Sequence, residues 1–240
     1  MQQNLYDFHK SNQFKHWWFN GRKSIIETLL KQHCSPGNLD ILDIGSGYGV
    51  LIPTLKKWGK VDALEPNHDC HDSLKQLGAD TIYPYSNFPL TFPNKQYDLI
   101  CLFDVLEHIE NHEQAIQIIK NQLLKPNGKL LITVPSYQWL WTTHDEDNHH
   151  YRRYSKKMLL KLLKSNNFNS IRTSYFMTLL FPLAVIQRLI SKMFSTKTNQ
   201  KNRPHFIVNA VFEKIFHMES KLISKLNLPY GLSIISIAEG

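Results

Sequence analysis

The chain has 240 residues, of which 42% are hydrophobic and 12% aromatic, and its formal net charge is +8. This composition is typical of one globular domain with a sizeable core and excludes a chain that is disordered throughout. The three cysteines, Cys34, Cys70 and Cys101, have no CxxC spacing, which argues against a zinc knuckle or a disulfide framework and favours a reducing, cytoplasmic setting.

The excess of positive charge lies toward the C-terminus. Eight Lys or Arg residues but only two acids, Glu213 and Glu219, occur from Arg188 to Lys225. Anionic lipid is one partner that such a segment suggests, and a solvated helix face is the simpler explanation. We expect no nucleic-acid partner, because the stretch THDEDNHHYRRY sets two arginines and two tyrosines beside three acids and so makes no basic stripe. The N-terminus has no signal-peptide pattern, so we expect a cytoplasmic protein, with peripheral contact at the inner face of the membrane as an alternative.

From residue 22 to residue 176, apolar runs of strand length alternate with segments of helical spacing. Strands are expected over residues 39–45, 60–66, 97–106, 129–135 and near 169–176, and helices over residues 22–33, 68–79, 111–124 and 155–168. Such alternation predicts an α/β fold in which a parallel sheet has helices on both faces. A ligand crevice is expected at the carboxyl ends of its strands.

The last third of the chain departs from this alternation. Residues 175–186 form an apolar run of 12 residues, short of the roughly 20 that span a bilayer. Residues 206–226 predict an amphipathic helix, and residues 231–238 a strand that returns to the sheet. Residues 175–226 could therefore contact a membrane surface peripherally, form a homodimer contact, or simply cap the fold with helices.

A glycine-rich loop follows the first strand. The segment DIGSGYG places Asp43, Gly45 and Gly47 there, where glycines allow a tight turn and bring backbone N–H groups close to a ligand. A dinucleotide fingerprint needs G-x-G-x-x-G, and position 50 is valine, so an NAD-dependent oxidoreductase is disfavoured. Glu65, at the end of the next strand, could accept hydrogen bonds from both hydroxyls of a ribose. An acid at a helix N-terminus is the alternative explanation for Glu65.

At this point the sequence resembles the class I S-adenosylmethionine-dependent methyltransferases. The resemblance rests on LDIGSGYG, ALEP, YDLICLFDVLEHI and LLKPNGKLLITVP, which occur in the family's order and at its usual spacing. It implies a Rossmann-like, doubly wound, mostly parallel seven-stranded sheet with helices on both faces. It also implies S-adenosyl-L-methionine as the cofactor.

The resemblance further implies roles for individual residues. Asp43 and Gly45 would contact or position the methionine moiety, Gly47 would lie close to the cofactor, and Glu65 would bind the ribose. Phe103 and Asp104, whose place in YDLICLFDVLEHI matches the family's post-strand segment, would face the methionine end. The family often has an acid near the end of the third strand that binds the adenine; here the nearest candidate is Asn87, whose amide could hydrogen-bond the base.

The sequence is also similar to a bacterial subgroup associated with polysaccharide, glycolipid or natural-product pathways. That likeness rests on HWWFNGR, HDEDNHHYRRYS and LPYGLS, and so covers almost the whole chain. It implies a single class I methyltransferase domain over residues 1–240. Its expected parts are an N-terminal helical segment (1–35), a Rossmann-like core (36–174 and 228–240) and a helical cap or insertion (175–227).

The stretch THDEDNHHYRRY follows the strand over residues 129–135 and therefore emerges at the same edge as the glycine loop. His144 or His150 could act as a base, with Asp145 as the carboxylate that orients it. His149 is less favoured, because the subgroup's pattern has a small residue there. Structural roles are the alternative: Asp145 could cap a turn and the neighbouring arginines could pair with acids.

Four more residues are expected on the substrate side of the crevice. Arg152, Arg153 and Tyr154 match the subgroup's pattern, and His108 lies just past a strand end. Tyr154 could instead begin the next helix, and His108 could order its loop. We expect no metal, because the histidines have no recognised ligand spacing and methyl transfer needs none.

The predicted function is methyl transfer from S-adenosylmethionine to a hydroxyl of a small, saccharide-like or lipid-linked acceptor, with a histidine base. Carbon and nitrogen acceptors remain open. The alternatives are a cofactor-binding or membrane-surface scaffold without turnover and, less favoured, an NAD-dependent oxidoreductase.

Overall fold

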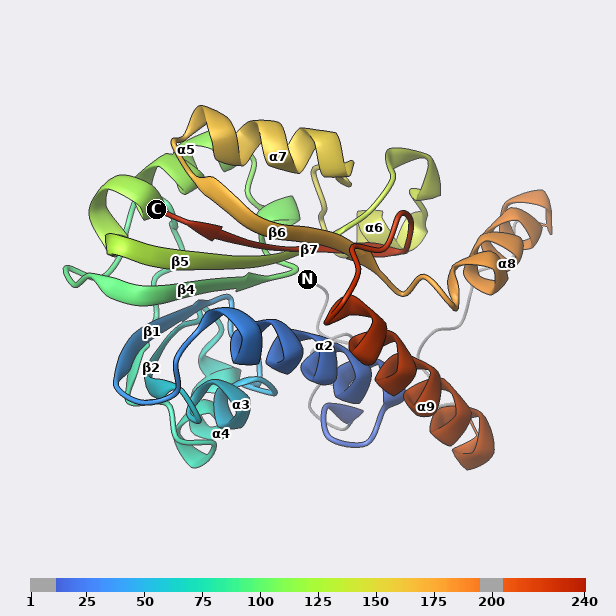
Figure 1. The fold of residues 1–240 in the computed structure, drawn as a ribbon, viewed down its shortest axis with the longest axis horizontal. Coiled ribbons are helices and arrows are strands. Elements are labelled where there is room, and N and C mark those ends of the chain that lie inside the picture. Colours follow the sequence, from blue (N-terminus) through green and yellow to red (C-terminus); the bar gives the residue numbers. More distant parts are fainter. Residues whose placement is uncertain (1–11, 195–204) are drawn as a thin grey trace.

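The computed structural model describes residues 12–194 and 205–240, and its strands form one seven-stranded sheet in the order β3-β2-β1-β4-β5-β7-β6 (Figure 1). The strands are β1 (Leu39–Ile44), β2 (Gly59–Leu64), β3 (Thr81–Tyr83), β4 (Tyr97–Phe103), β5 (Leu124–Pro135), β6 (Asn169–Phe176) and β7 (Ser233–Glu239). All neighbouring pairs are parallel except β5 with β7 and β6 with β7. The predicted Rossmann-like, mostly parallel sheet is confirmed, with β7 as the single antiparallel strand.

Helices cover both faces of the sheet (Figure 1). The longer ones are α2 (Trp17–His33), α5 (His112–Ile118), α7 (Lys156–Ser165), α8 (Phe181–Phe194) and α9 (Phe206–Ile223), and the short ones are α3 (Ile52–Leu55), α4 (His71–Gln76) and α6 (Thr143–Asp147). Single turns occur over His68–Cys70, Leu106–His108, Ile119–Leu123 and Gln138–Leu140. Helices α8 and α9 both lie between β6 and β7, within the range expected for an insertion.

The central strands are buried on both faces. Ile41 and Leu42 of β1 and Leu99 and Ile100 of β4 are fully buried, as expected for parallel strands whose sequences are nearly continuous apolar runs. Strand β1 has β2 on one side and β4 on the other, so the direction of chain progression reverses there. The loops that follow β1, β2, β4 and β5 consequently meet at one edge of the sheet, which we call the carboxyl edge.

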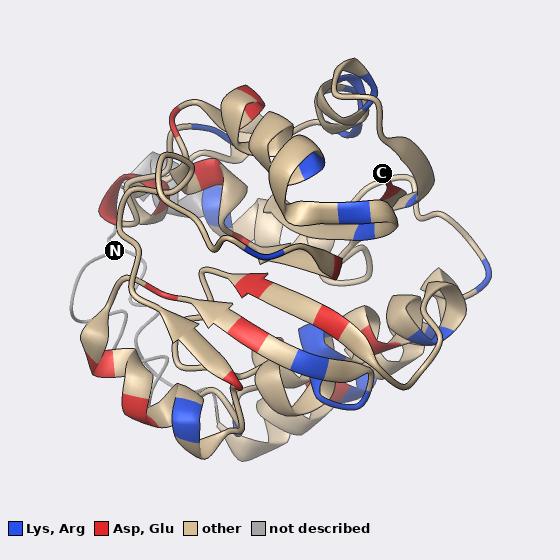
Figure 2. Cartoon of the chain, turned by 90° about the vertical axis from the view of Figure 1, so that its left-hand side faces the viewer, with Lys and Arg blue, Asp and Glu red and all other residues tan. Residues whose placement is uncertain are grey.

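Ion pairs occupy the opposite edge. Lys125 contacts Asp40 and Asp98 at 2.7 and 2.9 Å, and Lys95 contacts Asp40 and Asp62 at 3.3 and 3.0 Å. Figure 2, which views the molecule from this side, shows acidic and basic residues interspersed along the strands and helices. Because carboxylates pair with both lysines, Lys95 and Lys125 add little net positive charge to this edge.

Several elements begin or end at other residues than predicted. Helix α2 begins at Trp17 rather than Arg22, because the Nδ1 atom of His16 accepts a hydrogen bond from the N–H of Trp18 and caps the helix. Strand β4 ends at Phe103 rather than Leu106, since Asp104 has a φ of 56°. Strand β5 begins at residue 124 rather than 129, because Leu124 already pairs with Tyr97 of β4; a register shift follows, and regular pairing resumes at Lys129 with Leu99. The motif HWWFNGR thus supplies the cap, His16, and the first turns of α2, residues 17–22.

Helix α2 packs against α9 at Gly21. The ring of Trp17 meets Phe212 edge-on at 5.0 Å between centroids, and the backbone N–H of Trp17 donates to the side-chain oxygen of Asn209. A Cβ atom on Gly21 would overlap the ring of Phe216, which lies directly over this glycine. Gly21 therefore sets how closely the two helices approach.

Replacing Gly21 with Ala is expected to destabilise the protein by about 1–3 kcal/mol, because overpacking outweighs the better helix propensity of alanine. Thermal unfolding followed by circular dichroism should show a melting temperature lower by roughly 2–12 °C. Lys23→Ala, in the same helix and half-buried, is the control and should unfold like the wild type. Equal melting temperatures for the two variants would contradict the predicted close packing.

Candidate active site at the carboxyl edge

The glycine loop after β1 adopts a conformation that favours glycine. Gly45, Gly47 and Gly49 have φ values of 70°, 54° and 82°, in the left-handed region that side chains with a Cβ rarely occupy. A Cβ on Gly45 would also press on the side chain of Val105, after β4. Beside Gly47 there is open space, with no described atom within 4 Å of where a Cβ would stand. The loop thus combines a tight turn with room beside its centre.

Glu65 points at this loop from the end of β2. Its Oε2 accepts a hydrogen bond from the N–H of Gly47 at 2.7 Å, and its Oε1 accepts one from Asn67 at 2.9 Å. The side chain is buried, which raises the pKa of Glu65, and the two N–H donors partly offset that rise. The carboxylate predicted to accompany the loop is therefore in direct contact with it.

A second buried carboxyl group lies under the loop. Burial raises the pKa of Asp43 to about 7, with a further contribution from the charge of Glu65, whereas Ser46 and Arg22 act in the opposite direction. Two carboxyl groups so close together are stabilised by a cation and destabilised by an anion. The loop is consequently better suited to a positively charged ligand group than to a diphosphate.

Arg22 of α2 reaches across to the end of β4. Its Nη2 lies 2.9 Å from Oδ2 of Asp104, and its guanidinium group lies over the rings of Trp18 and Phe103 at 4.8 and 5.8 Å. The other carboxylate oxygen of Asp104 accepts from Thr133 of β5 at 3.1 Å. Arg22 was not among the predicted site residues. The sequence pointed to Arg22 only through its place in the motif HWWFNGR. No local sequence pattern could indicate that its partner is Asp104, which is distant in the sequence.

Asn87 lies apart from this network. Its side chain is exposed, in the segment after β3. The hydrogen bonds found for it among the described residues are made by its backbone carbonyl, which accepts from Leu90 and Thr91. Its contact with an adenine stays a prediction.

Beyond the glycine loop on the same edge, Asp145 is the centre of a buried network. It caps α6, with its Oδ2 accepting from the N–H of Thr142 at 2.8 Å. It also accepts from Nε of Arg153 at 2.7 Å and is paired with Nδ1 of His150 at 2.9 Å. Burial would raise the pKa of Asp145, but these hydrogen bonds hold it well below its usual range. The sequence had suggested three alternative roles for Asp145: capping a turn, pairing with an arginine, and orienting a histidine. In the structure its carboxylate makes all three contacts.

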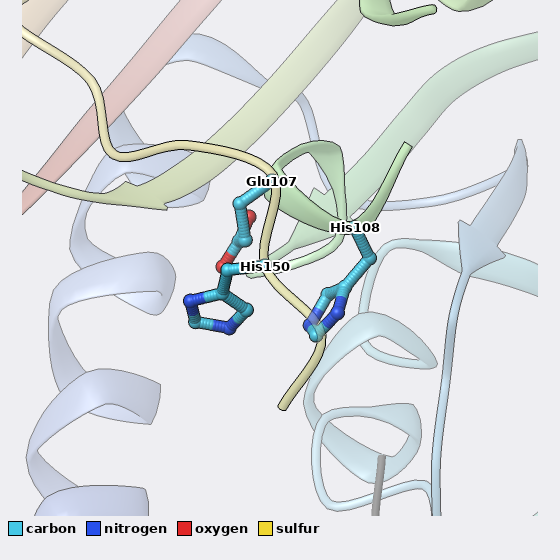
Figure 3. Close-up of side chains that lie close together, drawn as sticks. All are labelled: Glu107, His108 and His150. Atoms are coloured by element: carbon cyan, nitrogen blue, oxygen red, sulfur yellow. The ribbon is translucent and has the colours of Figure 1, made fainter. Parts of the chain in front are cut away.

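His150 meets two further side chains, as Figure 3 shows. Its ring lies edge-on to that of His108, with 4.6 Å between centroids, and Glu107 lies beside both. Burial, with His150 nearby, lowers the pKa of His108 to about 4, so this ring is neutral at physiological pH. Burial raises the pKa of Glu107 well above its usual range, and its Oε2 has no hydrogen-bond partner among the described residues.

The donor atoms of Glu107, His108 and His150 lie within 4.8 Å of one another, a spacing that a metal ion could bridge. The pKa of Glu107 is raised mainly by burial and by the negative charge of Asp104, and the guanidinium groups of Arg22 and Arg153 offset part of that rise. The same three side chains can also exchange a proton, because each carries a titratable atom.

The structure separates the other two histidines from this network. His144 has its Nε2 3.1 Å from the side-chain nitrogen of Asn148, and no hydrogen bond joins it to the carboxylate of Asp145 in the described part of the chain. Burial lowers the pKa of His144. His149 is exposed with a φ of 56°, which accounts for a small residue at this place in the subgroup's pattern. Asp145 is thus paired with His150.

Arg152, Arg153 and Tyr154 make contacts within the protein. Arg152 donates to the carbonyl oxygens of Ile109 and Glu110, both at 2.6 Å. Arg153 is buried against Asp145, and the hydroxyl of the fully buried Tyr154 lies 2.8 Å from Nδ1 of His112. These contacts tie the His150 segment to the residues after β4, and a direct contact of the three with substrate stays a prediction.

Comparison with known proteins gives a consistent result. Residues 7–173 match the model of a methyltransferase domain family. The ubiquinone biosynthesis O-methyltransferase of Rickettsia canadensis (strain McKiel) is 32% identical over 114 residues, which cover 45% of this chain and 48% of that protein. The mitochondrial ubiquinone biosynthesis O-methyltransferase of Dictyostelium discoideum is 25% identical over 192 residues, covering 66% and 60%. The chain spans about half the length of the first of these relatives.

Solved structures share the fold at low sequence identity. The N-methyltransferase NodS from Bradyrhizobium japonicum WM9, in complex with S-adenosyl-L-homocysteine, superposes with a TM-score of 0.57 at 10% identity, covering 95% of this chain and 90% of that one. At this identity the likeness concerns the architecture alone.

Proposed function

Because the chain belongs to the class I S-adenosylmethionine-dependent methyltransferases, we propose that it transfers a methyl group from S-adenosylmethionine to a hydroxyl oxygen of a small, lipid-linked acceptor. The observation that carries this proposal is the contact between Glu65 and the glycine loop at Gly47. This contact places a carboxylate, of the kind that binds a ribose in nucleotide-binding folds, next to a turn that has open space beside it.

The residues at the loop fit this cofactor. When bound, S-adenosylmethionine supplies an electrophilic methyl carbon and its own leaving group. Glu65 would accept from the ribose hydroxyls, and the buried carboxyl group of Asp43 and the half-buried one of Asp104 would favour the positive charges of a sulfonium and an ammonium group. Arg22 would hold Asp104 in place. Gly45, Gly47, Phe103 and Asn87 complete the proposed cofactor site.

The same carboxyl groups argue against an NAD-dependent oxidoreductase. A diphosphate at the loop would lie beside Asp43 and Glu65, which are both buried, and like charges in a buried site are strongly destabilising. Together with valine in place of the third fingerprint glycine, this favours a cationic cofactor.

His150 is proposed to take the proton from the acceptor hydroxyl. The bond from its Nδ1 to Asp145 leaves Nε2 available as the proton acceptor. Arg153 would position Asp145, and Arg152 and Tyr154 would hold the segment that carries His150. His108, neutral beside it, would contact the acceptor. His144 is kept as the less favoured base, because its ring is not paired with Asp145.

The names of these relatives support oxygen as the acceptor atom, and their ubiquinone pathway favours a lipid-linked acceptor over a saccharide-like one. The chain could be assayed with methyl-labelled S-adenosylmethionine and a bacterial lipid extract. We expect label in the organic phase as an ether that survives mild alkali. Label as an N-methyl group, or in the water-soluble saccharide fraction, would contradict the proposed acceptor, and cofactor binding without any transfer would favour a non-catalytic scaffold.

Replacing Glu65 with Gln is expected to raise the Kd for S-adenosylhomocysteine by about 10–100-fold, because two charge-assisted hydrogen bonds to the ribose become neutral ones. Isothermal titration calorimetry measures the change, and NAD should produce no binding heat. The matched control is Glu113→Gln, at an exposed position of α5. Unchanged affinity of Glu65→Gln would reject Glu65 as the ribose ligand.

A further inference from the structure

Helix α9 carries an exposed apolar stripe. Ile207, Val211, Met218 and Leu222 are each 40% to 60% exposed, and their spacing of 4, 7 and 4 residues puts them on one face of the helix. The opposite face, with the buried Phe216, packs against α2. The stripe is therefore not the face that holds α9 to the protein.

Helix α8 adds a second exposed apolar set. Leu179, just before the helix, and Leu183 and Ile186 within it are 45% to 55% exposed. Their spacing of four and three residues again defines one face. Single exposed apolar side chains are normal on soluble proteins, but two such sets on adjacent elements of the chain indicate a contact surface.

Both helices lie at the carboxyl edge. Helix α8 follows β6, which runs parallel to β5, and α9 leads into β7, which runs the other way. Figure 1 shows α8 and α9 projecting from the same end of the molecule, beyond the ends of the strands. The apolar stripe thus belongs to the edge that holds the candidate active site.

Positive charge accompanies the stripe. Lys214, Lys221 and Lys225 are exposed along α9 and its C-terminal end, and no ion pair engages them in the described ranges. A second copy of the chain would bring these lysines toward each other, whereas anionic headgroups would pair with them. Lysine stems also cover apolar surface while their ammonium groups stay in water, as at a membrane interface.

We propose that α8 and α9 dock the carboxyl edge onto the surface of a bilayer that contains anionic lipid. The apolar side chains enter the headgroup region, and the lysines contact lipid phosphates. In the described ranges, no helix is sufficiently long and apolar to cross a membrane, so the contact is peripheral. The docking stands independently of the proposed function, and it would bring a lipid-linked acceptor to the edge where His150 lies.

The test is sedimentation of the full chain with phosphatidylcholine vesicles, with and without phosphatidylglycerol. We expect binding only with the anionic lipid, weakened by salt. Replacing Lys214, Lys221 and Lys225 together with Gln should lower the partition coefficient by about 100-fold at low salt. The pair Val211→Ser and Met218→Ser should lower it by about 10-fold or more. Ile171→Ser, an exposed apolar residue on β6 at the opposite edge, is the control and should bind like the wild type.

Absence of wild-type binding to anionic vesicles, or equal binding of all the variants, would overturn the proposal. Sedimentation velocity tests whether a second copy of the chain binds the stripe instead. If the wild type is a dimer, and the Val211→Ser and Met218→Ser changes convert it to a monomer without altering vesicle binding, the stripe serves self-association. Titration of each variant with S-adenosylhomocysteine separates the two proposals. A variant that loses vesicle binding but keeps its cofactor affinity and methyl transfer shows that the docking surface is separate from the active site.

Discussion

Replacing His150 with Asn is expected to lower kcat by about 10²–10⁴-fold, the contribution that a positioned base typically makes. Asparagine can still donate to Asp145 but cannot accept a proton, so the fold is retained and the acid–base step is lost. The Kd for S-adenosylhomocysteine should stay at the wild-type value, because His150 is proposed to face the acceptor and not the cofactor. Turnover and calorimetry on the same preparation measure the two effects separately.

His149→Asn is the matched control, since it removes the exposed neighbouring imidazole at a residue with a φ of 56° that asparagine tolerates. It should turn over like the wild type, and added imidazole should partly restore His150→Asn. Dialysis against EDTA decides between a base and a metal ligand. Activity that survives EDTA fits the base, whereas activity that is lost and then restored by Zn²⁺ or Mn²⁺ would reassign Glu107, His108 and His150 to an ion. Equal losses of turnover and cofactor affinity in His150→Asn would also reject the base.

Replacing Asp145 with Asn should destabilise the protein by about 3–5 kcal/mol, because it leaves Arg153 buried without a charged partner. It should also lower kcat, since His150 loses the carboxylate that orients it. Chemical denaturation gives the free energy of unfolding. The double variant Asp145→Asn and Arg153→Met is the control: removing both charges should recover much of the stability but not the activity. A single variant as stable as the wild type would show that the pair is not buried in solution.

The stability difference between the wild type and Asp145→Asn should depend on pH. The folded pKa of Asp145 is lowered, so its carboxylate contributes stability above the ordinary aspartate pKa of about 4, and the contribution is lost as pH falls toward the folded pKa. The gap in unfolding free energy between the two proteins should therefore be full at neutral pH and shrink below about pH 4. A gap that stays constant over this range would contradict the lowered pKa.

The glycine loop and the acid that contacts it were largely predictable. Gly45, Gly47 and Glu65 were found from a glycine turn and an acid at consecutive strand ends, and the contact of Glu65 with Gly47 agrees with that spacing. Parallel strands bring their carboxyl ends to one edge whatever lies between them, so local patterns suffice there. Element ends were less predictable, because they depend on single contacts such as the cap that His16 provides to α2.

The network around Asp145 was predictable only as a set of candidate residues. Sequence offered His144, His149 and His150 as neighbours of Asp145 without ranking them by geometry, and the turn after α6 decides that His150 alone of these faces its carboxylate. Arg22 was missed for a related reason. Its partner Asp104 is distant in sequence and depends on how α2 crosses the sheet.

By itself, the sequence determined the α/β architecture, the glycine loop and the acid beside it, because hydrophobic periodicity and spacing within short segments encode them. Only the tertiary structure decided which histidine Asp145 holds, that Arg22 reaches Asp104, and that α9 packs on α2 through Gly21 while its apolar stripe faces outward. Each of these depends on side chains that meet across distant segments, where the packing of whole elements, rather than any local pattern, sets the distance between them.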